Sequence, residues 1–361
     1  MRPQTQSAVA NIRAWVEETI ASSEPGDRLP TMRQIMRRFQ TAQRTVEEAL
    51  RPYMDSGALR SRPGAGIVVA DPDERAPAQA DYEGDLLVLY RSSDSRLARN
   101  LLQEMESRLK SRGLSILQIG FSTEEQALSV LQRIGRFKTC LLQVNFEVLS
   151  IAFLAALHRH VDSIVVDGVS ATGIDVDSVG TNWREAVSVA FRILREKGHE
   201  RIAFLTSAHR ARQIAMARRE FELLSAALPD PSRSWLVEVD RLPGSYQISD
   251  ISSALEGLKG KGGALPFTAL IVWGVVEGFI LERALSEIGQ EAGKDVSVIL
   301  LASVDFASEH LGRFDVVGNS NAEKLKVFEE LVADRIAGTD REPETHYLTI
   351  DYQAHGSVTE P

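Results

Sequence analysis

The chain has 361 residues, 43% of them hydrophobic and 25% charged, so it is long enough for two or three folded domains and too apolar for a disordered protein. The formal net charge is −9, but residues 1–70 contain ten arginines, no lysine and seven acidic residues, which leaves that segment at +3. A basic segment on an acidic chain suggests that only the N-terminal part meets a polyanion such as DNA. Ordinary scatter of charged residues is the alternative interpretation.

The single cysteine and the short apolar segments favour a cytoplasmic protein. Cys140 is the only cysteine, so no disulfide can form within one chain, which fits a reducing compartment. The N-terminus lacks the apolar core of a secretory signal. The longest apolar runs, 141–157 and 267–281, are interrupted by polar residues and are too short to span a bilayer. We therefore expect a cytoplasmic location and no membrane contact.

Three helices are predicted in the first 55 residues. The first has apolar residues at helical spacing, namely Val9, Ile12, Val16 and Ile20. Thr31 and Gln34 form a Thr-x-x-Gln capping box that begins the second. The third has an apolar inner face made of Val46, Ala49, Leu50, Tyr53 and Met54. Pro52 should weaken or kink its last turn, because proline lacks a backbone N–H.

Residues 58–70, "ALRSRPGAGIVVA", predict two short strands around a Pro-Gly turn. Three helices followed by such a β-wing predict a small winged helix-turn-helix domain over residues 1–70. In that fold the third helix enters a major groove of DNA. The segment resembles the DNA-binding domain of the GntR family through "PGDRLP", "GAL", "RPGAG" and the spacing of Thr45-Val46 from Glu48-Ala49-Leu50.

The resemblance implies that Arg33, the start of the third helix and the wing glycine Gly64 lie at the DNA. When the residues on the polar face of the third helix are added, the candidate DNA contacts are Arg33, Gln43, Arg44, Thr45, Glu47, Arg51, Arg62 and Gly64. Two departures put the usual operator in doubt, because the family has arginine where Glu47 stands and a Ser-Arg pair where Ala42 and Gln43 stand. The side-chain amide of Gln43 has the donor and the acceptor that recognise adenine in the major groove. A winged helix that makes only protein contacts is the alternative.

Residues 71–84, "DPDERAPAQADYEG", predict an exposed linker. From residue 85 to 361 apolar strands alternate with amphipathic helices, which predicts an α/β body with parallel sheets and right-handed crossovers. The length suits two lobes with a cleft between them. Ligands of such sheets bind at the carboxyl ends of the strands.

The segment 177–206, "DSVGTNWREAVSVAFRILREKGHERIAFLT", resembles the LacI-type effector domain, which is similar in fold to periplasmic sugar-binding proteins. The matching residues are Val179, Thr181-Asn182, Gly198-His199 and Ile202-Ala203. The resemblance covers about residues 85–355. A GntR-type head on a LacI-type body is an architecture similar to that of arabinose repressors.

The resemblance and the polar residues near strand ends indicate candidate effector contacts, and they are Asp167, Asn182, Arg212, Arg218, Trp273, Glu277, Asp305 and Asn319. Several positions depart from the sugar-binding pattern, since Ala217 stands where an arginine is usual and Gly274-Val275 replace an Asn-Asp pair. Each candidate also has a structural alternative. Trp273 could be a core residue or a platform for a ligand. Arg212 and Arg218 could be solvated residues of a helix. Asp167 and Asn182 could cap strand ends and a helix.

No enzyme motif stands out. The phosphate-loop, dinucleotide-binding, H-E-x-x-H and G-x-S-x-G patterns are missing, so we expect no catalytic residues, no metal and no cofactor. The sequence predicts a transcription regulator, with repression as the expected mode, whose partners are a double-stranded DNA operator, a small-molecule effector such as a sugar, and a second copy of the chain. The alternatives are a body that only dimerises, or a ligand-binding protein with a vestigial head.

Overall fold

The computed structural model of the protein describes residues 3–55, 58–62, 66–70, 84–92, 95–146, 148–169, 175–260, 262–339 and 341–361. The chain divides into two compact units, Met1–Asp81 and Tyr82–Pro361, which we call the head and the body. Of the predicted linker, only Gly84 lies inside the described residues, where it begins the first strand of the body.

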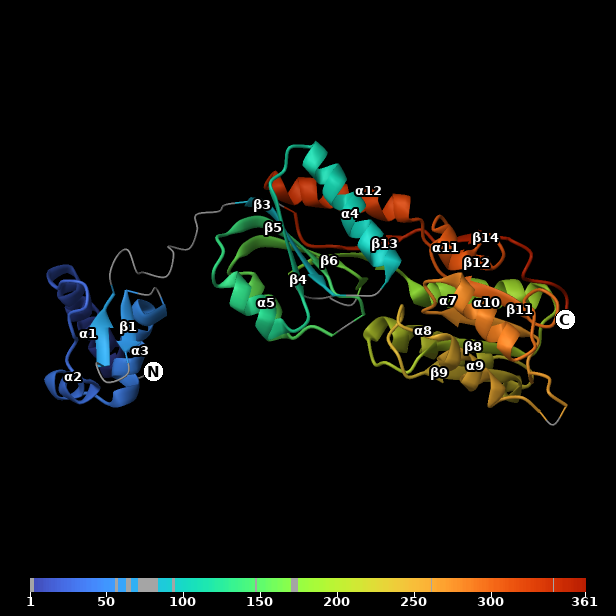
Figure 1. Ribbon diagram of the computed structural model, residues 1–361, viewed down its shortest axis with the longest axis horizontal. Helices are drawn as coiled ribbons and strands as arrows, with labels where there is room; N and C mark the ends of the chain where they lie inside the picture. The colour runs from blue at the N-terminus through green and yellow to red at the C-terminus, as the bar shows by residue number, and fades with distance from the viewer. Residues whose placement is uncertain are drawn as a thin grey trace. The chain divides into compact units, whose positions relative to one another are not determined.

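The head contains three helices and a two-stranded antiparallel sheet (Figure 1, blue). In chain order these are α1 (Pro3–Ser22), α2 (Met32–Arg38), α3 (Gln43–Asp55), β1 (Leu59–Arg62) and β2 (Gly66–Val69). Apolar residues from all three helices form its core, with Ile12, Val16, Ile35 and Val46 fully buried. The predicted winged helix-turn-helix is confirmed.

Local hydrogen bonds set the helix boundaries in the head. The Oε1 atom of Gln34 accepts from the backbone N–H of Thr31 at 2.8 Å, so the predicted capping box begins α2. The helix α3 continues through Pro52 to Asp55, so the missing N–H affects only its last turn. The Tyr53 hydroxyl donates to Glu17 at 2.8 Å and ties α3 to α1.

The body consists of two lobes, each built on a six-stranded sheet with helices on both faces. In the first lobe all strands are parallel, in the order β13 (Thr345–Leu348), β7 (Asp177–Thr181), β6 (Val161–Asp167), β5 (Phe137–Gln143), β3 (Gly84–Arg91), β4 (Ile116–Phe121). Its helices are α4 (Arg96–Ser111), α5 (Glu124–Leu131), α6 (Ile151–Leu157) and α12 (Asn321–Ile336).

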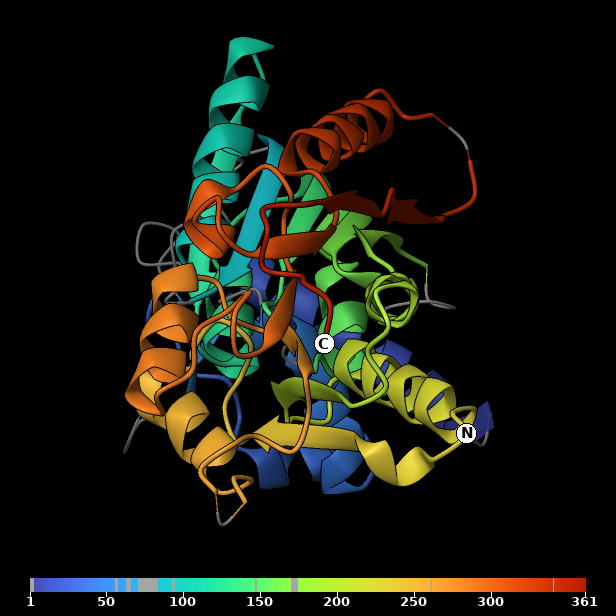
Figure 2. The ribbon, with the colours of Figure 1, turned by 90° about the vertical axis from the view of Figure 1, so that its right-hand side faces the viewer.

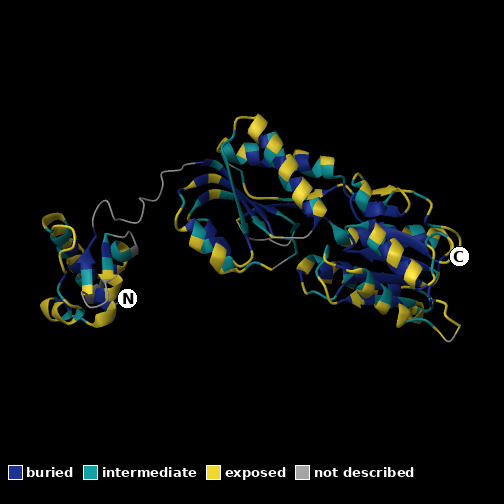
Figure 3. Cartoon of the chain, viewed as in Figure 1, coloured by how far each residue is buried: buried dark blue, intermediate teal, exposed yellow. Residues whose placement is uncertain are grey.

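The second lobe has a similar sheet with one antiparallel edge strand, in the order β14 (Asp351–Gln353), β12 (Asp315–Gly318), β11 (Ser297–Leu301), β10 (Ala269–Trp273), β8 (Ile202–Ser207), β9 (Ser234–Val239). Its helices are α7 (Trp183–Glu196), α8 (Arg212–Ala226), the 3-10 turn Pro231–Arg233, α9 (Ile248–Glu256), α10 (Gly278–Glu287) and α11 (Ala307–His310). The predicted two-lobed α/β body is confirmed. The central strands of both sheets are largely buried, whereas the edge strand β14 is exposed, and many exposed residues lie on the outer helix faces (Figure 3).

The chain crosses between the lobes at three places, after β7, after β12 and after β13. After β12 of the second lobe, the chain returns to the first lobe, where α12 packs in the core (Figure 2, red helix). The core of the first lobe therefore contains residues from both sides of the second lobe in the sequence. The crossings after β7 and β12 are joined directly, because the Thr181 hydroxyl donates to Asn319 Oδ1 at 2.5 Å.

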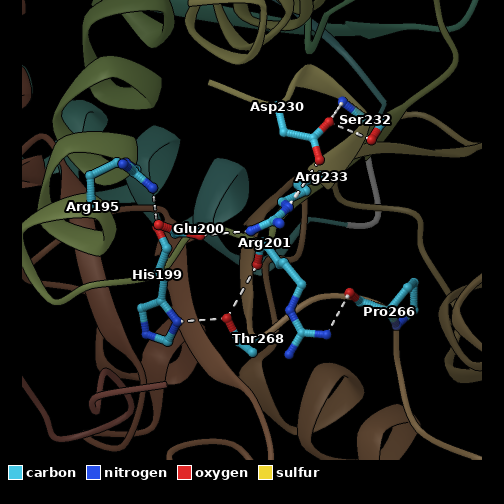
Figure 4. A network of polar contacts seen from close by, with 9 residues as sticks. All are labelled: Arg195, His199, Glu200, Arg201, Asp230, Ser232, Arg233, Pro266 and Thr268. Atoms are coloured by element: carbon cyan, nitrogen blue, oxygen red, sulfur yellow. Dashed lines mark hydrogen bonds and ion pairs between the residues drawn. The ribbon is translucent and has the colours of Figure 1, made fainter. Parts of the chain in front are cut away.

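His199 forms hydrogen bonds at the amino ends of the strands of the second lobe, opposite the edge where ligands are expected (Figure 4). Its Nδ1 lies 2.9 Å from the Thr268 hydroxyl, and its Nε2 lies 2.8 Å from the Thr359 carbonyl oxygen. Burial holds the pKa of His199 below its ordinary value, so the ring is neutral, donates to Thr359 and accepts from Thr268. The Gly-His motif therefore has a structural role here.

Candidate functional site

The outward face of α3 is polar and exposed. Gln43, Arg44, Glu47 and Arg51 are all exposed, as is Arg33 on α2. Beside this face lies a hollow of about 1330 Å³ that is open to solvent. Its lining comes from α2, α3 and the wing strands, and consists of Met32, Arg44, Glu47, Glu48, Leu50, Arg51, Met54, Ser61 and Ile67. The helix face and the wing thus border one concave surface, as a DNA-reading winged helix requires.

Two contacts within the head were not predicted. Gln43 Nε2 donates to Glu47 Oε1 at 2.7 Å, so the two side chains are paired. Arg38 stacks its guanidinium on Trp15, 4.8 Å from the ring centroid, so this arginine contributes to packing within the head.

The remaining candidate DNA contacts are less accessible or lie outside the described region. Thr45 is buried, with an exposed fraction of 7%, so most of its side chain packs inside the head. Arg62 ends β1, and only its backbone is described. Gly64 lies outside the described residues.

A cleft of about 1050 Å³, partly open to solvent, lies between the lobes at the carboxyl ends of the strands. Three aromatic rings, which we call the aromatic floor, form part of its apolar lining. The Trp273 ring at the end of β10 lies 4.9 Å from Trp183 and 5.7 Å from Phe146, measured between centroids. Trp273 is almost fully buried, with 2% exposed, whereas Trp183 is half-buried. Trp183 therefore offers the more accessible face for stacking.

The polar wall of the first lobe contains one ion pair. Lys324 of α12 contacts Asp167 at 2.6 Å, and Gln143 donates to the same carboxylate at 3.2 Å. Both charged side chains are 16% exposed. Because the two charges neutralise each other inside the cleft, this wall attracts neither anions nor cations strongly.

The second lobe contributes a buried carboxyl group, Glu309 of α11, which is 3% exposed. Burial raises the pKa of Glu309 to about 8, opposed in part by a 2.7 Å hydrogen bond from the Ser303 backbone N–H. The nearby carboxylate of Glu277 raises the pKa further, whereas Lys324 lowers it. At neutral pH Glu309 is therefore largely a neutral acid that can donate a hydrogen bond into the cleft.

The structure brings three of the eight predicted effector residues into this cleft: Asp167, Trp273 and Asn319. Asn319 is 6% exposed, and its Oδ1 accepts from Thr181.

The other five predicted residues are not among the cleft lining. Asn182 caps α7, where its Oδ1 accepts from the Glu185 backbone N–H. Arg212 is exposed at the start of α8, and its neighbour Gln213 lines the cleft instead. Arg218 pairs with Glu238 of β9.

Glu277 and Asp305 connect the lobes. The Oε1 of Glu277, just before α10, lies 3.5 Å from Arg96 Nε at the start of α4. Asp305 accepts hydrogen bonds from the Ser320 hydroxyl at 2.6 Å and from the backbone N–H groups of Asn321 and Ala322 at 2.8 and 3.0 Å. Its carboxylate is thus engaged at the N-terminus of α12.

Sequence reasoning missed several lining residues, namely Gln143, Asn145, Phe146, Trp183, Gln213, Glu309 and Lys324. Gln143 ends β5, and Asn145 and Phe146 follow it, so the rule that ligands bind at carboxyl ends of strands could have identified them. Glu309 and Lys324 carry no such signal, because they reach the cleft from helices.

The described residues contain no helix that is both long enough and apolar enough to cross a bilayer. Among the same residues, no three His, Cys, Asp or Glu side chains gather as a metal site would need.

Comparisons with known proteins found similarities for both the head and the body. Residues 4–69 match the family "Bacterial regulatory proteins, gntR family". A comparison with curated protein sequences gave no match.

Several solved structures with a similar fold are described as regulators of the LacI family. One is a LacI family transcriptional regulator from Enterococcus faecium with bound ribose, at 17% identity and a TM-score of 0.62, over 77% of this chain and 99% of that one. Another is the regulator CCPA from Weissella paramesenteroides with bound glucose, at 16% identity and a TM-score of 0.60, over 76% and 98%.

The transcriptional regulator CelR in complex with cellobiose is similar over 88% of this chain and 92% of its own, at 17% identity and a TM-score of 0.59. At identities this low, the structural similarity establishes the fold of the body and nothing more. The chain therefore has a winged helix-turn-helix head that matches the GntR family over residues 4–69, and a body with the fold of LacI family regulators.

Proposed function

We propose that the head binds a double-stranded DNA operator and that an uncharged, polyhydroxylated molecule in the cleft changes this binding. The observation that carries the effector class is the cleft itself, an aromatic floor beneath a neutralised polar wall. Aromatic rings stack against the apolar face of a sugar, and amide and hydroxyl groups bond its hydroxyls. The structural neighbours with bound ribose, glucose and cellobiose support this class.

The charges in the cleft oppose an anionic effector. Asp167 and Lys324 neutralise each other, and the described lining contains no arginine. Glu309 is neutral at pH 7 and becomes an anion at higher pH. A phosphate or carboxylate would therefore lack a free cation to compensate its loss of hydration.

Thermal unfolding with a panel of sugars tests the effector class. We expect at least one neutral mono- or disaccharide to raise Tm, since a ligand at 100 times its Kd adds about 2.7 kcal/mol to stability. The matching sugar phosphates should raise Tm less. A larger shift with a phosphate than with its parent sugar would overturn the proposed class, and no shift with any compound would favour a body that only dimerises.

The proposed DNA-binding role of the head rests on the concave face of α3 and the GntR match. Fluorescence anisotropy on random and genomic DNA fragments, at several salt concentrations, tests it. We expect affinity to fall as salt rises, because phosphate contacts release counterions. No binding at low salt would favour a vestigial head.

We further propose a cytoplasmic homodimer that acts as a repressor. Two winged helices on a two-fold axis would contact two operator half-sites, because symmetric heads match palindromic DNA. Light scattering on residues 84–361 tests whether the body dimerises alone, and a monomer at micromolar concentration would contradict this. Transcription from a promoter with the selected operator tests the sign of regulation.

A further inference from the structure

Gln43 and Glu47 form an exposed hydrogen-bonded pair on the face of α3 that the proposed function places at DNA. The bond is 2.7 Å long and spans one turn of the helix. Both side chains are exposed, so water could satisfy either of them separately.

The bond determines which way the Gln43 amide faces. An ionised carboxylate only accepts hydrogen bonds, so the amide nitrogen must be the atom next to Glu47. One N–H is used in this bond, which leaves the second N–H and the Oε1 oxygen for another partner. Bidentate recognition of adenine needs one acceptor for N6–H and one donor for N7. The unused half of the Gln43 amide offers that pair.

Nearby charges reduce the repulsion that Glu47 would otherwise exert on phosphate. Arg44, Arg51, Glu47 and Glu48 line one hollow, and their formal charges sum to zero. An exposed glutamine also loses side-chain freedom when it binds a base, and a partner that orients it beforehand lowers this cost.

From these observations we propose that Glu47 is a positioning residue, which holds the Gln43 carboxamide for an adenine, so that the two side chains recognise one base pair as a unit. The proposal rests on DNA binding by the head. Glu47 then neither contacts its own base nor acts mainly by repelling phosphate.

The test uses the full-length protein and randomised double-stranded DNA. Sequences bound by the wild type are selected, and affinities are measured for the selected site, for single-base changes in it and for random DNA. The variants are Gln43→Ala, Glu47→Ala, the double variant and Glu47→Gln. Glu48→Ala is the matched control, because it removes the same charge from the same helix.

We expect Gln43→Ala and Glu47→Ala to weaken the selected site by about 5- to 150-fold relative to random DNA, at the same adenine position. The double variant should lose no more than Gln43→Ala alone, because the pair acts as a unit. Glu47→Gln keeps an acceptor beside Gln43 and should retain the preference. Glu48→Ala should retain it too, while strengthening random binding as much as Glu47→Ala does.

Three outcomes would overturn the proposal while leaving DNA binding intact. Glu47→Ala could keep the adenine preference that Gln43→Ala loses, or change the preference at a different base pair, or Gln43→Ala could have no effect on preference. Failure of every protein, the wild type included, to bind random DNA at low salt would instead refute the proposed function itself.

Discussion

The two tryptophans of the cleft floor have different roles, which can be separated by substitution. Trp273 is 2% exposed and packs in the core of the second lobe, whereas Trp183 is half-buried beside the cleft. Trp273→Ala should cost about 3–5 kcal/mol of stability, since it leaves a cavity. Trp183→Ala should cost less and abolish the sugar-induced rise in Tm. Urea unfolding and thermal shift measure the two effects, and an unchanged shift in Trp183→Ala would place the ligand elsewhere.

The buried Glu309 makes stability depend on pH. Its pKa is about 8 in the folded protein and near 4.5 when unfolded, so the folded state binds the extra proton between these values. Its stabilising contribution is complete below pH 4.5 and is lost as pH rises to 8, with a slope of at most about 1.4 kcal/mol per pH unit.

Glu309→Gln removes this titration. Relative to the variant, the wild type should lose stability from pH 5 to pH 8 in urea unfolding. If the two proteins show parallel pH profiles, Glu309 titrates at an ordinary pKa and its place in a dry part of the cleft is wrong.

For individual residues, the sequence could identify only part of the candidate effector site. Asp167 and Trp273 end strands, and Asn319 follows one, so the rule that ligands bind at carboxyl ends of strands placed them near the cleft. Asp305 and Arg218 were candidates too, but each carries a charge that interacts with a residue of another element, and neither lines the cleft. Lys324 could not be predicted, because its partner Asp167 comes close only through the return of α12.

Among the elements, α12 depends on a carboxylate from the other lobe. Burial would raise the pKa of Asp305, but the hydrogen bonds from Ser320 and from the start of α12 outweigh it and leave the pKa below its ordinary value. The ionised group stabilises the fold above pH 3.8, and this contribution is lost as pH falls through the lowered pKa.

We expect Asp305→Ala to lower the free energy of unfolding by about 0.5–1.5 kcal/mol at pH 7, because Asp305 is exposed and solvent screens its hydrogen bonds to the start of α12. Asp240→Ala is the control, because Asp240 is an exposed aspartate of the same lobe. Urea unfolding measures both. An equal and small effect of the two changes would show that Asp305 does not hold α12.

Element boundaries in the head were predictable because they depend on local chemistry. The Thr31 capping box and the apolar spacing of α3 act within one or two turns, and both appear in the structure. The pairing of Gln43 with Glu47 was not predicted, although the shared face was, because spacing shows which residues are neighbours but not which atoms bond.

For the whole molecule, the relation between the lobes was the least predictable feature. The order of strands and helices favoured two lobes, and the sheet orders confirm them. Two of the contacts that join the lobes involve residues more than 100 positions apart, namely Thr181 with Asn319 and Arg96 with Glu277. No local pattern encodes such a pair.

The ion pair between Arg96 and Glu277 should stabilise the arrangement of the lobes described above, which we call the closed arrangement. It joins the start of α4 in one lobe to the segment before α10 in the other, beside the cleft. Arg96 is 65% exposed, so the pair should contribute no more than about 1 kcal/mol. Since apparent affinity falls with the fraction of binding-competent molecules, Arg96→Ala should weaken sugar binding by up to about fivefold.

Isothermal titration with the sugar that gives the largest thermal shift measures this effect. Glu277→Gln should weaken binding to the same extent, and the double variant should add nothing further, because both changes remove one interaction. Arg283→Ala is the matched control, since Arg283 pairs with Glu287 within α10 and joins no lobes. The difference between Arg96→Ala and the control should shrink as salt rises. Equal affinities for Arg96→Ala and Arg283→Ala at low salt would mean that closure does not depend on this pair, and that the crossings after β7 and β12 set the lobe equilibrium instead.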